Sequence, residues 1–292
     1  MKKVIFILVG IVFFGLSVVN FSSCKPEEEI PEDTTKTVLN EQTVEDANYT
    51  TDVFIDVVAD VLVSADENDT KEKSYSTTCA TITYEPTVGY PKTLTIDYGT
   101  TGCDINGHLL TGTITATISD RIRKEDTEIA ISFTDFKVDT LEVNGTMSLI
   151  INSVDVITDN KIDFTTTLTG CSLSMPSGDI SIAGTMDITW NLNTLSDYND
   201  DTFDITSGNL TGTNRRGKSF TATVLSTLTY TVECSTIVSG ELQMQTSDVN
   251  YPATIDFGNG TCDKIATVST TIEIQVGNQT FTQNYSYEIT LP

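Results

Sequence analysis

Alternation of apolar with polar side chains is the feature that most constrains this chain. Between Ile180 and Leu192 every second residue is apolar or glycine, and mostly Ser, Thr, Asp and Asn stand between them. Side chains of a β-strand point alternately to the two faces of its sheet, so this segment predicts a strand with one buried face. Residues 268–276 and 281–291 repeat the pattern, with position 283 as the exception. Such alternation is typical of antiparallel sheet with one face open to water.

The composition favours the same fold class. Thr is far above its usual share in this chain, and Val, Ile, Phe and Tyr accompany it. These side chains suit a pleated, half-buried surface. Between Phe133 and Phe136 the apolar positions change parity, which predicts a bulge at Thr134 or Asp135. Five glycines inside predicted strands indicate sharp bends. They are Gly112, Gly145, Gly184, Gly212 and Gly240. We therefore expect a mainly β protein of long, curved antiparallel sheets.

One amphipathic helix is predicted over residues 44–65. Its apolar arc follows helical spacing and consists of Val53, Phe54, Val57, Val58, Val61 and Leu62. Asp52, Asp56 and Asp60 recur every four residues on the opposite side. We interpret this aspartate stripe as the solvated face of a helix packed on a sheet, and a cation site is the alternative. The acidic run 66–69 is expected to end the helix.

An internal repeat divides the β region, residues 74–292, into two related halves. The segment YPKTLTIDYG at 90–99 lies between Cys79 and Cys103, and YPATIDFG at 251–258 lies between Cys234 and Cys262. Two halves starting near residues 79 and 234 are indicated, either fused into one sandwich or set side by side. Asp97 and Asp256 occupy matching positions, where strand-end or turn capping is expected and a shared acid site is the alternative.

The matching cysteines predict two disulfides. In an exported chain, equivalent spacing favours Cys79 with Cys103 and Cys234 with Cys262. Cys171 remains, and we expect a buried inert thiol, with a reactive thiol as the alternative.

The first 24 residues have the parts of a secretory signal. Lys2 and Lys3 precede an apolar run over 4–19, and small residues precede Cys24. This arrangement resembles the lipobox of bacterial lipoproteins, which implies a signal peptide over 1–23 and acylation of Cys24. An ordinary signal peptide and an uncleaved anchor are the alternatives. Residues 24–43 are acidic, contain two prolines and are expected to form a flexible tether.

The charge of the chain restricts its partners. The formal net charge is −25, so nucleic acid and anionic lipid headgroups are repelled. Attachment to a membrane is therefore expected through the acyl groups of Cys24, palmitate among them. The charged tract after Cys24 is similar to tracts that send lipoproteins to the outer face of the outer membrane. The expected location is the cell surface, and the periplasmic face is the alternative.

Motifs for catalysis are sparse. His108 is the sole histidine and lies in a predicted turn, no Cys-x-x-Cys pair suits zinc, and no Gly-x-Ser-x-Gly elbow occurs. A weak calcium site is considered at Asp197, Asn199 and Asp201, with a solvated loop as the alternative. Trp190 lies on the apolar face of its strand and is expected in the core. We expect no enzyme activity and no cofactor other than this calcium.

Longer segments carry a family resemblance. They are GTNRRGKSFT at 212–221, VSG at 238–240 and DFGNGTCD at 256–263. Together with the acidic helix, they are similar to a family of uncharacterised bacterial surface lipoproteins, which implies a lipoprotein with a duplicated β fold. The expected function is non-enzymatic binding of a protein or glycan, or an envelope-structural role. The alternatives are a carboxylate-based polysaccharide hydrolase and a carrier of an apolar ligand.

Overall fold

The computed structural model describes residues 41–70, 79–105, 107–194, 197–247, 251–276 and 279–291. All of them belong to one compact unit that covers residues 33–292. The predicted signal peptide, the acylated Cys24 and the tether up to residue 40 lie outside the described residues.

One helix and thirteen strands make up the described fold. They are α1 (Glu41–Thr70), β1 (Thr81–Glu85), β2 (Lys92–Ile105), β3 (His108–Ile118), β4 (Glu128–Val138), β5 (Leu141–Asp155), β6 (Lys161–Ser174), β7 (Ile180–Asn191), β8 (Thr202–Thr213), β9 (Ser219–Thr231), β10 (Thr236–Thr246), β11 (Ala253–Asn259), β12 (Ile265–Val276) and β13 (Gln279–Thr290). The strands form a single sheet in chain order, each antiparallel to the next. The expected mainly β class, with long antiparallel strands and one helix, is confirmed. Both repeat copies lie in this one sheet, at β2 and β11.

The period-two pattern sorts side chains as predicted. Ile180, Ile182, Met186, Ile188 and Trp190 of β7 are buried. Thr185 and Asp187 of the same strand are exposed on the other face. Burial of one apolar face along every long strand supplies the main stabilisation of such a sheet.

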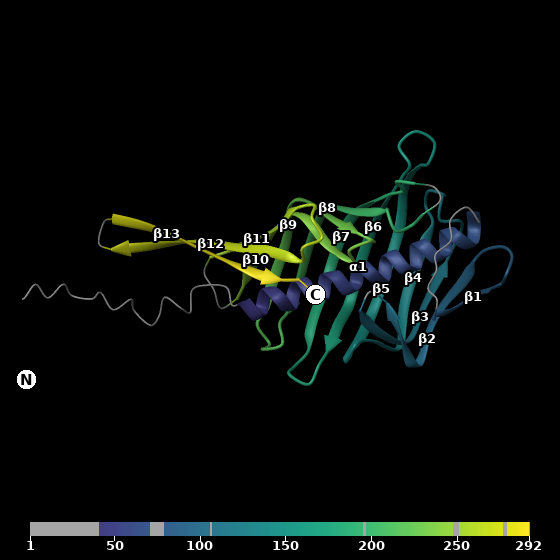
Figure 1. The fold of residues 1–292 in the computed structure, drawn as a ribbon, viewed down its shortest axis with the longest axis horizontal. Coiled ribbons are helices and arrows are strands. Elements are labelled where there is room, and N and C mark those ends of the chain that lie inside the picture. The colour runs from purple at the N-terminus through teal and green to yellow at the C-terminus, as the bar shows by residue number, and fades with distance from the viewer. Residues whose placement is uncertain are drawn as a thin grey trace, which may run out of the picture. The chain divides into compact units, whose positions relative to one another are not determined.

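Helix α1 is longer than the predicted 44–65 and is buried nearly all round. Figure 1 shows it running across the strands, and it contacts β2, β7 and β10. Phe54, Val58 and Leu62 are fully buried, but so is Ser64, and Asp52 is only 3% exposed. The interpretation of the aspartate stripe as a solvated face is therefore wrong. The sheet curves round the helix and supplies polar partners to the side that we expected to face water.

The predicted bulge at Thr134 or Asp135 is confirmed. The pairing of β4 with β5 shifts register between Ser132 and Lys137, and Asp135 has a φ of 50°. On the neighbouring strand β3, a Cβ added to Gly112 would lie 2.2 Å from the Asp135 carbonyl oxygen. Glycine is required at position 112 because the bulged backbone approaches it too closely for any side chain.

Gly240→Ala is expected to lower the free energy of unfolding by about 2–3 kcal/mol, because it combines a clash with a left-handed backbone. The added Cβ would lie 2.1 Å from the Thr227 carbonyl oxygen, and φ is +101°. Gly217→Ala is the matched control, since φ is +72° but nothing lies within 4 Å. The control is expected to lose only about 1 kcal/mol. If urea denaturation shows the same loss of unfolding free energy for both variants, the close approach of the Thr227 carbonyl to position 240 does not contribute.

Candidate functional site

Aspartates along α1 connect the helix to the surrounding sheet, and they form the main polar feature of the interior. We call them the helix aspartates: Asp46, Asp52, Asp56, Asp60, Asp66 and Asp69. Each contacts a side chain from a strand or a loop of the sheet. A buried carboxylate without hydrogen bonds would cost several kcal/mol, so these contacts are what make the burial of the helix possible.

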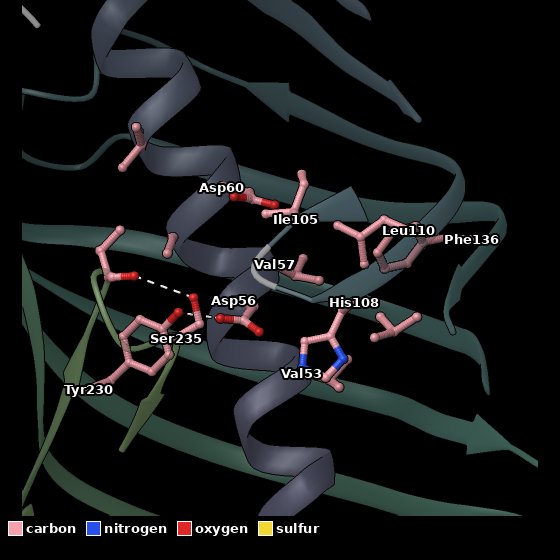
Figure 2. Close-up of a pocket in the computed structure, with 14 residues that line it drawn as sticks. Val53, Asp56, Val57, Asp60, Ile105, His108, Leu110, Phe136, Tyr230 and Ser235 are labelled. Carbon is pink, nitrogen blue, oxygen red and sulfur yellow. Dashed lines mark hydrogen bonds between the residues drawn. The ribbon is translucent and has the colours of Figure 1, made fainter. Parts of the chain in front are cut away.

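Two of the helix aspartates line a small cavity in the middle of α1 (Figure 2). Asp56 accepts a hydrogen bond from the Tyr230 hydroxyl, and Asp60 accepts one of 2.8 Å from the Tyr98 hydroxyl. The cavity holds about 60 Å³. Its other lining residues are Val53, Val57, Ala59, Val63, Ile105, His108, Leu110, Phe136, Val138, Tyr230, Val232 and Ser235. This space suits a few water molecules, whereas ligand pockets usually measure about 300–1,000 Å³.

Burial changes the acidity of two helix aspartates, Asp56 beside this cavity and Asp52 one helical turn before it. Desolvation raises the pKa of Asp52 to about 7, although the Thr236 hydroxyl, the Ile237 amide and Lys264 act in the opposite direction. Desolvation also holds the pKa of Asp56 well above its ordinary value, against the hydrogen bond from Tyr230. Oδ1 of Asp52 has no hydrogen-bond partner within the described part of the chain. The Asp52 carboxyl is therefore protonated over part of the neutral range, and burial disfavours the charged form of Asp56 in the same direction.

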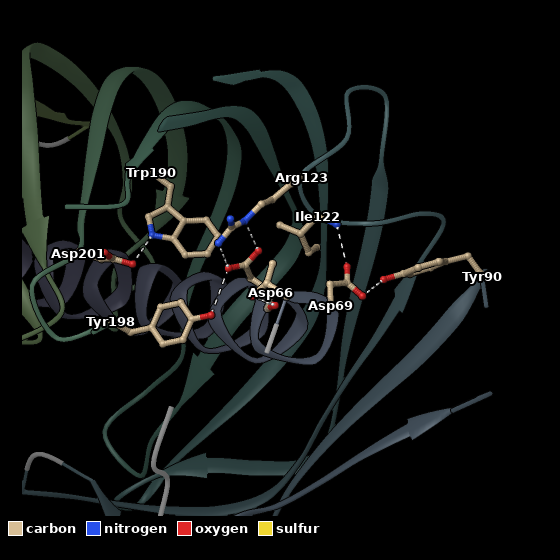
Figure 3. Close-up of polar contacts among 9 residues, drawn as sticks. Asp66, Asp69, Tyr90, Ile122, Arg123, Trp190, Tyr198 and Asp201 are labelled. Carbon is tan, nitrogen blue, oxygen red and sulfur yellow. Dashed lines mark hydrogen bonds and ion pairs between the residues drawn. The ribbon is translucent and has the colours of Figure 1, made fainter. Parts of the chain in front are cut away.

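The C-terminal half of α1 holds a buried ion pair (Figure 3). Arg123, from the loop between β3 and β4, donates to both oxygens of Asp66 at 2.7 and 2.8 Å, and the Tyr198 hydroxyl donates at 3.2 Å. Asp66 is fully buried. A two-point contact of this kind fixes the guanidinium and the carboxylate in one geometry.

Polar contacts also attach the two ends of the helix to the sheet. Asp69 accepts from the Tyr90 hydroxyl and lies 3.7 Å from the Lys92 ammonium. At the other end, buried Asp46 pairs with Arg215, from the turn between β8 and β9. The sequence suggests only a basic surface turn at Arg215. Its buried partner was missed because the two residues lie 169 positions apart.

The predicted cysteine pairs are joined in the structure. Cys79 is bonded to Cys103 and Cys234 to Cys262, with Cα distances of 5.5 and 5.7 Å. Cys171 is buried as a free thiol, and desolvation raises its pKa to about 11. A thiol of this acidity is not a nucleophile at neutral pH, which agrees with the expected inert role.

The matching acids of the repeat have matching local roles. The Gly99 amide donates to Asp97 at 2.8 Å, and the Gly258 amide donates to Asp256 at 2.9 Å. Each of these hydrogen bonds spans two residues inside a strand, β2 or β11, where the glycine has a positive φ. The side chains therefore hold a local kink within the strand, and neither lies at the strand end or turn that we expected. His108 begins β3, and its Nδ1 lies 2.9 Å from Asp139 Oδ2 in a partly exposed pair.

The calcium candidates do not converge on one point. Asp201 is buried and accepts from the Trp190 indole at 3.0 Å (Figure 3), whereas Asp197 accepts from the Asn199 amide at 2.9 Å in an exposed turn. Trp190 is fully buried, as expected of a core residue. Within the described ranges, no group of three or more His, Cys, Asp or Glu side chains is arranged to hold a metal ion.

The outer face of the sheet carries hydrogen-bonded side chains across four strands. Asn152 of β5 donates to Thr165 of β6 at 2.9 Å, and Thr165 donates to Asp187 of β7 at 2.7 Å. Ser207 of β8 donates to the second oxygen of Asp187 at 2.7 Å. We call these four residues the outer polar ladder. The hydroxyls hold the pKa of Asp187 below its ordinary value, so the ladder is a fixed, charged surface feature.

Comparisons with protein families, with curated proteins and with solved structures yield no match to this chain. Among the described residues, no helix combines the length and the apolar character needed to cross a membrane.

Proposed function

We propose that this chain is a lipid-anchored protein of the bacterial outer membrane that acts by non-enzymatic binding or as a structural component of the envelope. In this proposal Cys24 carries the acyl groups, and the folded β unit offers the outer face of its sheet to a protein or glycan. The leader, the acidic segment that follows it and the two disulfides support an extracytoplasmic location.

One observation carries the binding part of the proposal. The apolar side chains of α1 fill the interior, and the cavity beside Asp56 measures about 60 Å³. Recognition is thereby left to the outer face, where the outer polar ladder presents hydroxyls and carboxylates in fixed positions. Groups held in place before binding lose less conformational entropy when a ligand arrives. Rows of hydroxyls and carboxylates suit the hydrogen-bonding groups of a glycan or of a polar protein surface.

The two alternatives have less support. A carrier of an apolar ligand needs an open groove between sheet and helix, but Phe54, Val58 and Leu62 occupy that space. A polysaccharide hydrolase needs two carboxyls that reach a sugar. Asp56 and Asp60 share a cavity and each accepts from a tyrosine, yet the cavity is too small for a sugar ring.

The anchor is tested by labelling cells with palmitate. The wild-type chain is expected to incorporate the label and to be degraded when protease is added to intact cells. Cys24→Ser is expected to lose the label, and Cys171→Ser is the matched control, because it removes a cysteine that the proposal does not acylate. Label retained in Cys24→Ser would contradict the anchor, and protection from protease would place the protein on the periplasmic side.

Binding is tested by capture of envelope proteins and by a glycan array. The wild-type protein is expected to retain a ligand, and Asp187→Asn is expected to weaken that binding about tenfold or more, because a charged hydrogen-bonding group is lost. Asp120→Asn removes a carboxylate that is 37% exposed, in the loop after β3, and is the control. The hydrolase would be favoured instead if no ligand is captured, the wild-type protein cleaves a polysaccharide, and Asp56→Asn abolishes that cleavage.

A further inference from the structure

The last strand, β13, forms an open edge of the sheet. Among the described residues its one strand neighbour is β12. The two strands pair over all twelve residues, from Ile265 with Thr290 to Val276 with Gln279, without a register shift. β11 pairs only with residues 267–270 of β12, so the outer half of the hairpin extends beyond the rest of the sheet (Figure 1).

The direction of the backbone groups in β13 follows from one hydrogen bond. The Leu291 amide donates to the Lys264 carbonyl at 2.8 Å, so position 291 faces β12. In antiparallel pairing, successive residues turn their amide and carbonyl groups alternately toward one neighbour and then the other. With no register shift, the residues whose backbone groups point away from β12 are Thr280, Thr282, Asn284, Ser286, Glu288 and Thr290.

This edge lacks the features that usually prevent strand pairing. Natural edge strands are short, or carry lysine, proline or a bulge. β13 has twelve residues, contains no lysine, proline or glycine, and has Glu288 as its single charge. The other edge strand, β1, has five residues and is followed by Pro86. Of the two edges, β13 alone offers a long row of backbone donors and acceptors that no register shift interrupts.

We propose that β13 pairs antiparallel with β13 of a second copy of this chain, about a two-fold axis at Asn284. Two identical edges match in length, whereas β1 of a second copy would leave most of β13 uncovered. The axis also makes the contact self-complementary, as in other two-fold dimers. The proposal does not depend on the function proposed above.

Charge and side-chain pairing support a second copy as the occupant. A chain with a net charge of −25 repels itself, so contact is least costly along a strand with a single charge. With the axis at Asn284, Glu288 faces Thr280 of the second copy and the two glutamates stay apart. Phe281, which is 51% exposed, faces Tyr287 of the second copy at a position where side chains approach closely.

Cross-linking tests the position of the axis. Asn284→Cys in the full chain is expected to form a disulfide-linked dimer, because the two copies of residue 284 face each other at a distance that a disulfide can bridge. Ser148→Cys is the matched control, since it is exposed on β5, a strand with neighbours on both sides. The dimer should disappear on reduction. Equal dimer fractions in both variants, or none in Asn284→Cys, would overturn the proposal.

Proline tests the backbone contact itself. Asn284→Pro removes an amide that points away from β12 and spares the backbone pairing within the hairpin. Like Asn284→Ala, it loses the 3.0 Å hydrogen bond from the Thr271 hydroxyl of β12 to Asn284 Oδ1. Sedimentation of the full chain in non-ionic detergent should show a wild-type dimer, with a dissociation constant raised about tenfold or more by Asn284→Pro. Asn284→Ala keeps the amide and should remain dimeric. Circular dichroism checks that each variant is folded. A monomeric wild type at every concentration, or a heterologous peptide found on β13 instead, rejects the proposal.

Discussion

Asp66→Ala is expected to lower the free energy of unfolding by about 3–5 kcal/mol, as removal of one partner from a buried ion pair usually does. The variant leaves the Arg123 guanidinium, which is 16% exposed, without its carboxylate, and it also removes the acceptor of the 3.2 Å contact from Tyr198. Denaturation in urea, followed by circular dichroism, measures the loss.

Two further variants separate charge burial from simple loss of a contact. Asp120→Ala removes the exposed partner of Lys124, and its unfolding midpoint is expected to match the wild type. Asp66→Ala combined with Arg123→Met removes both charges and should recover part of the lost stability, because no unpaired charge remains buried. If the double variant is less stable than Asp66→Ala alone, the ion pair is not what makes position 66 sensitive.

Much of the fold follows from local sequence pattern. The alternation in β7, the parity change at Asp135 and the matching cysteine pairs each predict what the structure contains. These features are predictable because each depends on neighbouring residues, or on a repeat that places equivalent residues in equivalent positions. Side-chain period and bulges are properties of one strand and its nearest partner.

The environment of the helix could not be predicted in this way. The sequence pattern of an aspartate stripe opposite an apolar arc is the same whether the stripe faces water or further strands of a curved sheet. Asp46, Asp56 and Asp60 find their partners at Arg215, Tyr230 and Tyr98, which are remote in sequence. The one available signal is that polar residues also lie outside this stripe. Thr50, Thr51, Ser64 and Asp66 are spread around the helix, and all four are buried.

The same burial predicts that this protein becomes less stable as the pH rises from about 4 to about 8. In the unfolded chain the carboxyls have a pKa of about 3.9, whereas burial raises the pKa of Asp52 to about 7 and that of Asp56 well above its ordinary value. The folded state therefore holds protons that the unfolded state has released. The stabilisation that comes from protons bound to these buried carboxyls is fully present below about pH 4. It is lost as the pH rises through the pKa values of the carboxyls in the folded state.

Asp52→Asn isolates one of these groups. The rise of the Asp52 pKa from 3.8 to about 7 corresponds to a free energy of at most ~4 kcal/mol. The variant should therefore be more stable than the wild type at about pH 8 by up to that amount, and nearly equal to it at about pH 4. Asp97→Asn removes an exposed carboxylate from β2 and is the control for a change in surface charge. Urea denaturation at each pH measures the difference. If Asp52→Asn and Asp97→Asn follow the same curve, the buried carboxyl at position 52 is not the source, and general repulsion among the surface acids accounts for the loss of stability with pH.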